Sequence, residues 1–226
     1  MNILVLAAHP DDETIGAGGT IARLAAAGHK VFLWVATEIY EPIWPATQKP
    51  PRRAETEKAA EILGVSEIIF AQLPTMNLAA MPPLDLSNIV SRAVSEFHPE
   101  LILCPPPADV NSDHSAVFDI ALVAARGLPD NPIRALYAYE IQTTTRFAAP
   151  DRLFQPTTYV DVTDTFARKL EAFAAYETEK RAFPHPRSPE GLEILAKERG
   201  LACGFKYAEA FACIIRRFHS SEPLAL

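Results

Sequence analysis

The sequence has few cysteines, no long apolar run and no excess of positive charge. Its three cysteines, Cys104, Cys203 and Cys213, are far apart and form no C-x-x-C pair, which argues against a disulfide framework and favours a cytoplasmic location. No apolar run approaches the roughly 20 residues that a membrane-spanning helix needs, so no membrane span is expected. The net charge of −7, without a block of lysine and arginine, argues against nucleic acid as a partner.

What the sequence does contain is typical of one α/β domain. Its 226 residues, of which 49% are hydrophobic and 22% charged, suit a single core. The chain has no internal repeat, low-complexity segment or linker, and its first residues lack the charged start and cleavage site of a signal peptide. We therefore expect a single domain over residues 1–226.

Apolar runs alternate with helical patterns along the chain. Strands are predicted at residues 3–8, 30–37, 67–71, 100–104, 134–141 and 157–162. Helices are predicted at 15–28, 52–63, 84–97, from 112 onward and at 165–180, with a further helix after that. This order predicts a Rossmann-like, doubly wound and mostly parallel sheet of five or more strands, with helices on both faces.

An acidic turn follows the first predicted strand. His9, Pro10, Asp11, Asp12 and Glu13 stand between that strand and the next helix, where open α/β sheets bind their ligands. An imidazole and a carboxylate three residues apart on one turn can both bind a divalent metal, so His9 and Asp12 fit as ligands. Asp11 is then left to take a proton from water. The alternative is that the acidic residues only cap and charge the helix start, which needs one carboxylate rather than three.

A second polar turn follows the predicted strand at 100–104. Three prolines end that strand and a helix begins soon after them, which puts His114 at the same edge of the sheet as the first turn. His114 is therefore the expected third metal ligand, and a His-Asp-His set leaves a position for water. Asp113 beside it would orient a neighbouring polar group, whereas Asp109 and Asn111 are typical of turns and helix N-caps.

The run AHPDDE after an apolar strand resembles the signature of the PIG-L/LmbE-like superfamily of zinc-dependent N-deacetylases, which remove acetyl groups from N-acetylglucosaminyl and related substrates. The resemblance continues through an R-x-x-E pattern at Arg52 and Glu55 and through the Asp113-His114 pair. It also covers a C-terminal stretch from HPRS to YAEAF, where Glu209 matches the family without an assigned role.

The resemblance implies a metal centre and a substrate contact. Zn²⁺, or another divalent metal, would be bound by His9, Asp12 and His114. Arg52 would contact a small N-acetyl sugar, with Arg53 as the adjacent alternative, and Glu13 would lie behind the ligands as a supporting carboxylate. Because relatives assemble, a homo-oligomer is also left open.

At one position the sequence departs from the family pattern. Many members carry a histidine three positions before the ligand histidine, where it stabilises the developing oxyanion, and this chain has Asn111 there. An asparagine amide can donate to an oxyanion, but it cannot serve as a general acid. The resemblance makes His185, in a proline-flanked loop, a candidate proton donor. Asn111 and His185 therefore both stay candidates for the oxyanion, and Asp11 and His185 for protonation of the amine.

A proline-rich stretch from residue 38 to residue 51 shows no periodicity. A long irregular loop in a compact domain is usually functional, and this one would overhang the edge of the sheet that carries the two polar turns. Trp44 and Tyr40 are candidate stacking faces for a sugar. The alternative is a surface loop packed by its own aromatic side chains.

These features predict metal-assisted removal of an acetyl group from an N-acetylated amino sugar or glycoside. Two alternatives stay open: a metal-dependent hydrolase of a non-sugar amide or ester, and a catalytically silent metal-binding module. A dinucleotide-binding protein is disfavoured, because Gly16, Gly18 and Gly19 do not form the fingerprint and the preceding carboxylates would repel a pyrophosphate.

Overall fold

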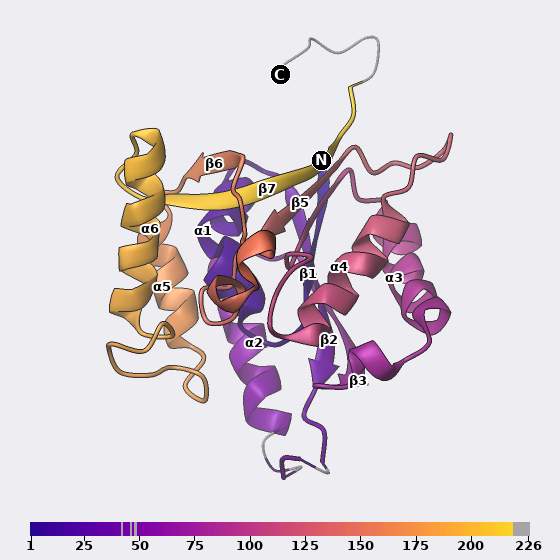
Figure 1. The fold of residues 1–226 in the computed structure, drawn as a ribbon, viewed down its shortest axis with the longest axis horizontal. Coiled ribbons are helices and arrows are strands. Elements are labelled where there is room, and N and C mark those ends of the chain that lie inside the picture. Colours follow the sequence, from indigo (N-terminus) through magenta and orange to yellow (C-terminus); the bar gives the residue numbers. More distant parts are fainter. Residues whose placement is uncertain (42, 46, 48, 219–226) are drawn as a thin grey trace.

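The computed structural model of the protein describes residues 1–41, 43–45, 47 and 49–218. Within these residues, seven strands form one sheet in the order β3-β2-β1-β4-β5-β7-β6 (Figure 1). The strands are β1 (Asn2–Ala7), β2 (Lys30–Glu38), β3 (Glu67–Pro74), β4 (Leu101–Cys104), β5 (Ala135–Tyr139), β6 (Thr158–Asp161) and β7 (Ala208–Arg216). β1 to β5 are parallel, whereas β7 runs antiparallel between β5 and β6.

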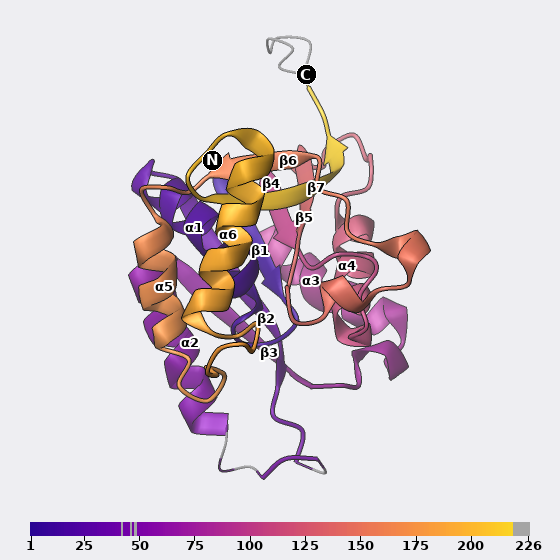
Figure 2. The same cartoon turned by 60° about the vertical axis from the view of Figure 1, so that its left-hand side comes forward.

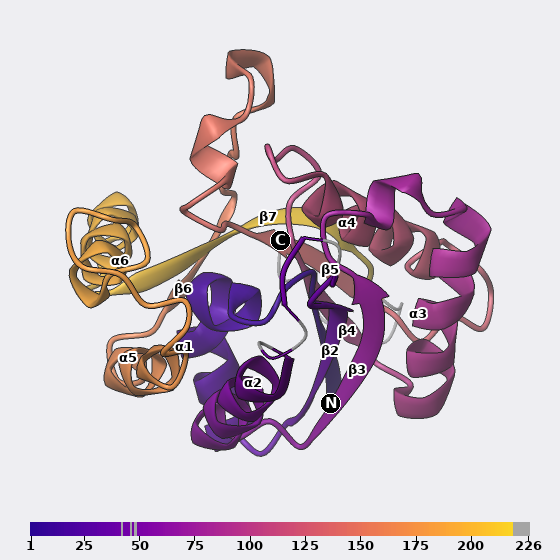
Figure 3. The same ribbon diagram turned by 90° about the horizontal axis from the view of Figure 1, so that it is seen from below.

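Helices cover both faces of this sheet, as Figures 2 and 3 show. One face carries α1 (Asp12–Ala26), α2 (Lys49–Leu63), α5 (Phe166–Ala174) and α6 (Pro189–Cys203). The other face carries α3 (Pro83–Phe97) and α4 (Ser112–Ala124). Short 3₁₀ turns are η2 (Leu78–Ala80), η3 (Thr145–Phe147) and η4 (Pro150–Arg152). The doubly wound, mostly parallel α/β fold is therefore confirmed.

β1 is apolar on both sides because it lies at the centre of the sheet. Ile3 and Val5 pack in the core layer under α1 and α2, while Leu4 and Leu6 pack in the layer under α3 and α4. All four side chains are fully buried. A continuous apolar run is typical of a parallel strand that is covered on both faces.

Two elements differ from the prediction. The stretch at 165–180, predicted as one helix, is helical only over α5, and the chain has neither helix nor strand from there to α6. β7 is not predicted from the sequence, because Glu209 interrupts the apolar residues of its first half. Glu209 is nonetheless buried, since the backbone N–H groups of Gly19 and Thr20 and the ammonium of Lys169 all donate to its carboxylate.

The pairing of β1 with β4 determines where the polar turns meet. Val5 lies beside Leu103 in the parallel register, so both strands end at the same edge of the sheet. The predicted loop at 38–51 is shorter than expected, because α2 begins at Lys49; its residues 42, 46 and 48 lie outside the described residues. No described helix is long and apolar enough to cross a membrane, and all three cysteines are free thiols.

Candidate metal centre

The turn after β1 has a backbone conformation that ordinary residues rarely adopt. Asp11 has φ 103° and ψ −24°, in the left-handed half of conformational space, which costs free energy for a residue other than glycine. Asp12 begins α1, and its Oδ2 accepts the N–H of His9 at 2.8 Å. The backbone N–H and the hydroxyl of Thr37 on β2 both donate to the carbonyl of Ala8. The strained turn is thus held from both of its sides.

The turn after β4 places His114 in the first turn of α4. Asn111 is the N-cap of this helix, and its Oδ1 accepts the N–H of Asp113 at 3.0 Å. Asp109 Oδ1 in turn accepts the N–H of Asn111 at 2.8 Å. The N-cap prediction for Asn111 is confirmed, and the cap directs His114 toward the end of β1.

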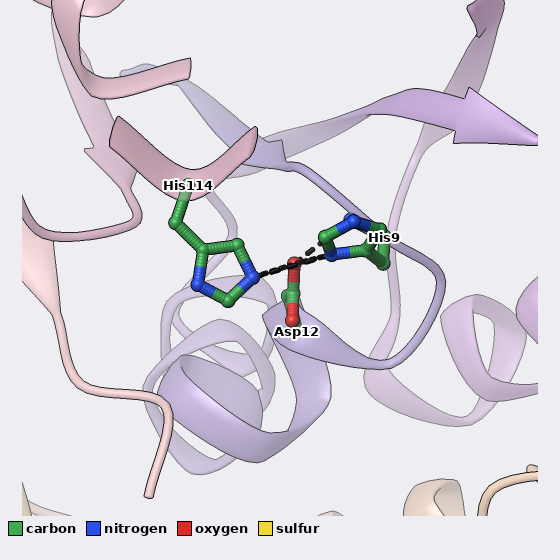
Figure 4. Close-up of side chains that lie close together, drawn as sticks. All are labelled: His9, Asp12 and His114. Carbon is green, nitrogen blue, oxygen red and sulfur yellow. Dashed lines mark hydrogen bonds and ion pairs between the residues drawn. The ribbon is translucent and has the colours of Figure 1, made fainter. Parts of the chain in front are cut away.

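His9, Asp12 and His114 come together as a potential ligand set (Figure 4). His9 Nδ1 lies 3.3 Å from Asp12 Oδ2 and 3.2 Å from His114 Nε2, and His114 Nε2 lies 3.4 Å from the same Asp12 oxygen. A tetrahedral zinc ion with bonds of about 2.0–2.1 Å has ligand–ligand distances of roughly 3.3 Å. The three predicted ligands therefore fit a small divalent ion with mixed nitrogen and oxygen ligands.

Each histidine has its other ring nitrogen on a carboxylate. His9 Nε2 lies 3.0 Å from Asp113 Oδ2, and His114 Nδ1 lies 3.1 Å from Asp109 Oδ2. Carboxylates in this position fix the ring orientation and tautomer of metal-binding histidines and increase their basicity. This leaves Nδ1 of His9 and Nε2 of His114 as the ring nitrogens that face the shared ligand position.

Backbone and hydroxyl donors hold these two carboxylates in place. Asp113 accepts the N–H groups of Met76 and Leu78 at 2.6 and 3.0 Å, in the segment that joins β3 to α3. Asp109 Oδ2 accepts the hydroxyls of Thr144 and Thr145, both at 2.9 Å. The supporting position predicted for Asp113 agrees with these contacts. Asp109, predicted only as a turn former, has a fully buried side chain against His114.

Burial and charge together change the proton affinities of this group. Burial lowers the pKa of His114, but Asp12 and Asp109 outweigh it and raise that pKa to about 10. Burial raises the pKa of Asp12, but His114 and His9 outweigh it and hold that pKa below its usual range. Without a metal ion, the carboxylates thus favour protonated histidines.

Asp11 is buried beside the ligand set without being part of it. Neither of its carboxylate oxygens forms a hydrogen bond with a described residue. Burial raises the pKa of Asp11 well above its ordinary value, against the effect of Arg187, whose Nε lies 3.3 Å from Asp11 Oδ2. A buried carboxylate with free oxygens and a pKa raised by burial suits a group that accepts a proton during a reaction.

Arg187 is the contact that sequence reasoning missed in the HPRS stretch. His185, the residue predicted there, is exposed, and its Nδ1 accepts the backbone N–H of Arg187 at 3.0 Å. The proline-flanked loop does approach the site, but the described contact with Asp11 comes from Arg187. The signal available in the sequence was an arginine two residues after the histidine in the same loop.

Glu13 lies behind the turn rather than among the ligands. Its Oε1 accepts the hydroxyls of Thr14 and Tyr176, both at 2.6 Å, and its side chain is buried. Burial raises its pKa despite these hydrogen bonds. Glu13 therefore ties the first turn of α1 to the segment after α5, a supporting role in which Tyr176 is its unpredicted partner.

A cavity of about 330 Å³ opens beside the ligand set. Its lining residues come from the acidic turn, β2, α2 and β3: His9, Pro10, Thr37, Glu38, Ile39, Arg52, Arg53, Phe70, Gln72 and Thr75. Both candidate arginines reach it. Arg52 forms an ion pair with Glu179, and Arg53 lies 4.5 Å above the ring of Phe70. Trp44 is partly exposed and is not among the described residues that line this cavity.

Known proteins with assigned activities resemble this chain over much of its length. It is 26% identical to diacetylchitobiose deacetylase of Thermococcus kodakarensis, with 99% of this chain and 86% of that protein covered. It is 28% identical to 1D-myo-inositol 2-acetamido-2-deoxy-α-D-glucopyranoside deacetylase of Kineococcus radiotolerans, with 66% of this chain covered. The chain spans about half the length of that second relative, of which 52% is covered.

The fold itself is shared with a protein of different activity. The crystal structure of the 4-carboxy-2-hydroxymuconate hydratase GalB from Pseudomonas putida matches with a TM-score of 0.77 and 22% identity, over 99% of both chains. Since one fold can carry different reactions, this likeness supports the architecture alone. The family model described as GlcNAc-PI de-N-acetylase matches residues 4–125, which is more than half of the chain and includes both turns of the candidate metal centre. The chain belongs to this PIG-L family.

Proposed function

We propose that the protein is a zinc-dependent hydrolase that removes the acetyl group from an N-acetylated amino sugar or glycoside. The observation that carries this proposal is the position of Asp11. A buried carboxylate whose oxygens accept no hydrogen bond from a described residue directly precedes Asp12 of the His-Asp-His ligand set. His9 and Pro10 of the same turn line a cavity large enough for a small molecule.

Zinc fits the donor atoms of the proposed site. His9 Nδ1, Asp12 Oδ2 and His114 Nε2 are two imidazole nitrogens and one carboxylate oxygen, which is a donor set used by catalytic zinc together with one water. When bound, zinc would act as a Lewis acid on the acetyl carbonyl and lower the pKa of its water toward about 7.

Asp11 would carry the proton through the reaction. Water attacks the carbonyl carbon of the acetyl group while Asp11 takes its proton. The same carboxyl then returns this proton to the amine nitrogen as the C–N bond breaks, which gives acetic acid and the free amino sugar. The second proton of the water leaves when the acetic acid ionises to acetate. Asp11 is favoured over His185 for this second step, because His185 is exposed and its Nδ1 is engaged with Arg187.

Asn111 would donate to the developing oxyanion. Its Oδ1 is used by the cap of α4, and this orientation leaves the NH₂ of the same amide as the donor group. A neutral donor is sufficient for this role, and such a donor contributes roughly 10²- to 10³-fold to a rate. With Asp11 as the proton carrier, the site needs no second histidine at this position.

The substrate would lie in the cavity beside His9. Arg52 and Glu38 line it as hydrogen-bonding groups, and Ile39 and Phe70 give it apolar walls; this mixture suits a sugar ring with an acetamido group. The two relatives named above act on a diacetylated disaccharide and on a glucosaminyl inositol derivative, which supports an N-acetyl sugar here. Trp44 remains a candidate for a stacking contact with the distal part of such a substrate.

The test is an assay for both products. Zinc-loaded enzyme is incubated with N-acetylglucosamine, diacetylchitobiose, an N-acetylglucosaminyl inositol, an O-acetyl ester and a non-sugar acetamide, and acetate and primary amine are measured. Equal amounts of acetate and amine from an N-acetyl sugar are expected. Turnover of the ester or the non-sugar amide alone would favour the broader hydrolase, and full metal loading without any turnover would favour a silent metal-binding module.

Two further proposals concern the protein in the cell. A cytoplasmic location is in keeping with three free cysteines, of which Cys104 is buried. Fractionation of cells that express the tagged protein would test it. A homo-oligomer stays a prediction, and light scattering coupled to size-exclusion chromatography would measure the mass directly.

A further inference from the structure

Four charged residues from three separate segments, Asp11, Arg52, Glu179 and Arg187, form a continuous row beside the proposed metal centre. Arg187 Nε lies 3.3 Å from Asp11 Oδ2, and Arg187 Nη1 donates to Glu179 Oε2 at 2.7 Å. The other oxygen of Glu179 forms an ion pair with Nη1 of Arg52. Glu179 is 5% exposed, so one buried carboxylate holds two arginines. We call Arg52, Glu179 and Arg187 the arginine bridge.

The two ends of the arginine bridge lie in different parts of the site. Arg52 lines the cavity proposed for the sugar, and Arg187 contacts the carboxylate proposed to carry the proton. Among the described contacts there is none directly between Arg52 and Arg187. Any mechanical link between the cavity and Asp11 along this row therefore passes through Glu179.

Both ends also retain unused hydrogen-bonding capacity. The Nε atoms of Arg52 and Arg187 and both oxygens of Asp11 are buried and form no hydrogen bond with a described residue. Buried polar atoms without partners are costly in a native structure. Arg52 lines the cavity, and Arg187 Nε faces Asp11 Oδ2 as an ion pair at 3.3 Å. The unused hydrogen-bonding capacity thus lies beside the cavity and at the carboxylate proposed to carry the proton.

The position of Glu179 is fixed by the residue one helical turn after Arg52. Glu55 accepts the backbone N–H of Thr178 at 2.9 Å and the Thr178 hydroxyl at 2.6 Å. This contact docks α2 onto the segment after α5 and brings Glu179 against Arg52. The two residues of the R-x-x-E pattern thus act together. Arg52 enters the cavity, and Glu55 holds the segment that carries Glu179, the ion-pair partner of Arg52.

We propose that Glu179 is a positioning residue for the reaction. By holding one arginine with each carboxylate oxygen, Glu179 keeps Arg52 in the sugar cavity and prevents Arg187 from pairing fully with Asp11. The bound sugar and the proton-carrying carboxylate are thereby placed relative to each other. This inference rests on the proposed N-deacetylase function.

Substitution of Glu179 should disturb both ends at once. In Glu179→Gln, which keeps the shape of the side chain, Arg52 loses its ionic partner and Arg187 is left with Asp11 alone. We expect KM to rise and kcat to fall, with a combined loss of about 10- to 100-fold in kcat/KM and an unchanged zinc content. Arg52→Lys should change mainly KM, and Arg187→Lys mainly kcat.

Glu140→Gln is the matched control. Glu140 is 3% exposed and forms a two-pronged pair with Arg199, at 2.6 and 2.7 Å, on the side of α6. Its substitution removes the charge from an equally buried glutamate–arginine pair outside the proposed site. Glu140→Gln should lower the melting temperature but leave kcat and KM as they are. A purely structural role of Glu179 would make the two variants alike.

A double-mutant cycle completes the test. The Arg52→Lys/Arg187→Lys enzyme should deviate by about twofold or more from the product of the two single losses in kcat/KM, and this deviation should disappear in the Glu179→Gln background. If the wild type turns over an N-acetyl sugar and Glu179→Gln is fully active, the inference is wrong but the proposed function stands. The same holds if the coupling between Arg52 and Arg187 survives in the Glu179→Gln background. Absence of wild-type turnover on every N-acetyl sugar would overturn the proposed function and the inference with it.

Discussion

Two buried carboxylates beside α1 have opposite surroundings. Glu209, which reaches the middle of this helix from β7, accepts the N–H groups of Gly19 and Thr20 at 2.9 and 2.7 Å and the ammonium of Lys169 at 2.6 Å. The carboxylate of Asp11, at the start of the helix, accepts no hydrogen bond from a described residue. Both are buried, so burial alone does not distinguish a structural carboxylate from a functional one. The number of hydrogen bonds that the carboxylate oxygens accept does distinguish the two.

The difference also determines what each carboxylate can do. Glu209 is surrounded by donors and ties β7 and α5 to α1, so its negative charge is fixed in place. Asp11 has a cation at 3.3 Å but free oxygens, and its backbone is held at φ 103°. A backbone conformation that costs free energy, at a residue whose carboxylate accepts no hydrogen bond from a described residue, contributes little to stability and fits a reactive group.

The largest expected effect separates Asp11 from its neighbour Asp12, the proposed metal ligand. Asp11→Asn removes the proton acceptor but not a ligand atom, so turnover should fall by about 10²- to 10⁴-fold while zinc content stays near that of the wild type. Acetate release and metal analysis on the same sample measure both. Asp12→Ala is the matched variant, and it should lose metal and turnover together. Wild-type kcat in Asp11→Asn would remove Asp11 as the base.

The second effect concerns stability rather than turnover. Glu209→Gln leaves the ammonium of Lys169 buried without its counter-charge, and breaking one partner of a buried pair costs about 3–5 kcal/mol. Urea unfolding should show this loss, whereas kcat of the folded enzyme should not change. Glu198→Gln breaks an exposed pair with Arg146 and should cost less than about 1 kcal/mol. A drop in kcat for Glu209→Gln would show that Glu209, like Asp11, has a functional role and is not only structural.

The sequence predicted what depends on local pattern. The acidic turn with His9 and Asp12 is contiguous, and His114 was found because parallel strands that end in polar turns bring those turns to one edge. The sheet and its coverage followed from the alternation of apolar runs and helical patterns. These predictions need only the spacing of apolar residues along the sequence and the direction of the strands.

What the sequence did not predict depends on long-range contacts. Asp109 reads as a turn former, and only the packing of the segment after β5, which brings Thr144 and Thr145 to it, shows why it is buried against His114. The HPRS stretch lies in a loop, which has no periodicity to tell which of its side chains turns inward. Arg187, rather than His185, therefore emerged only with the fold.

The third prediction tests the carboxylates behind the histidines. Asp109→Asn keeps the size of the side chain but removes the charge that orients His114, so zinc affinity should fall by about 10- to 100-fold. Competition with a chromophoric chelator measures this directly. Asp119→Asn, on an exposed position of the same helix α4, is the control and should bind zinc as the wild type does. Equal affinity in both variants would reduce Asp109 to the turn former that the sequence suggested.

The smallest expected effect is a pH dependence of metal binding. Because Asp12 and Asp109 raise the pKa of His114 to about 10 in the metal-free protein, zinc must displace a proton from this ring throughout the neutral range. Because one proton is released when zinc binds, zinc affinity should rise by about tenfold for each pH unit. This rise should continue from pH 6.5 to 8.5. An ordinary histidine, with a pKa near 6.5, would give a plateau above about pH 7. Asp109→Asn removes one of the two charges that raise this pKa, so its slope should flatten at lower pH than that of the wild type. A wild-type plateau above pH 7, measured with metal buffers of known zinc activity, would show that the carboxylate behind His114 orients the ring without keeping it protonated.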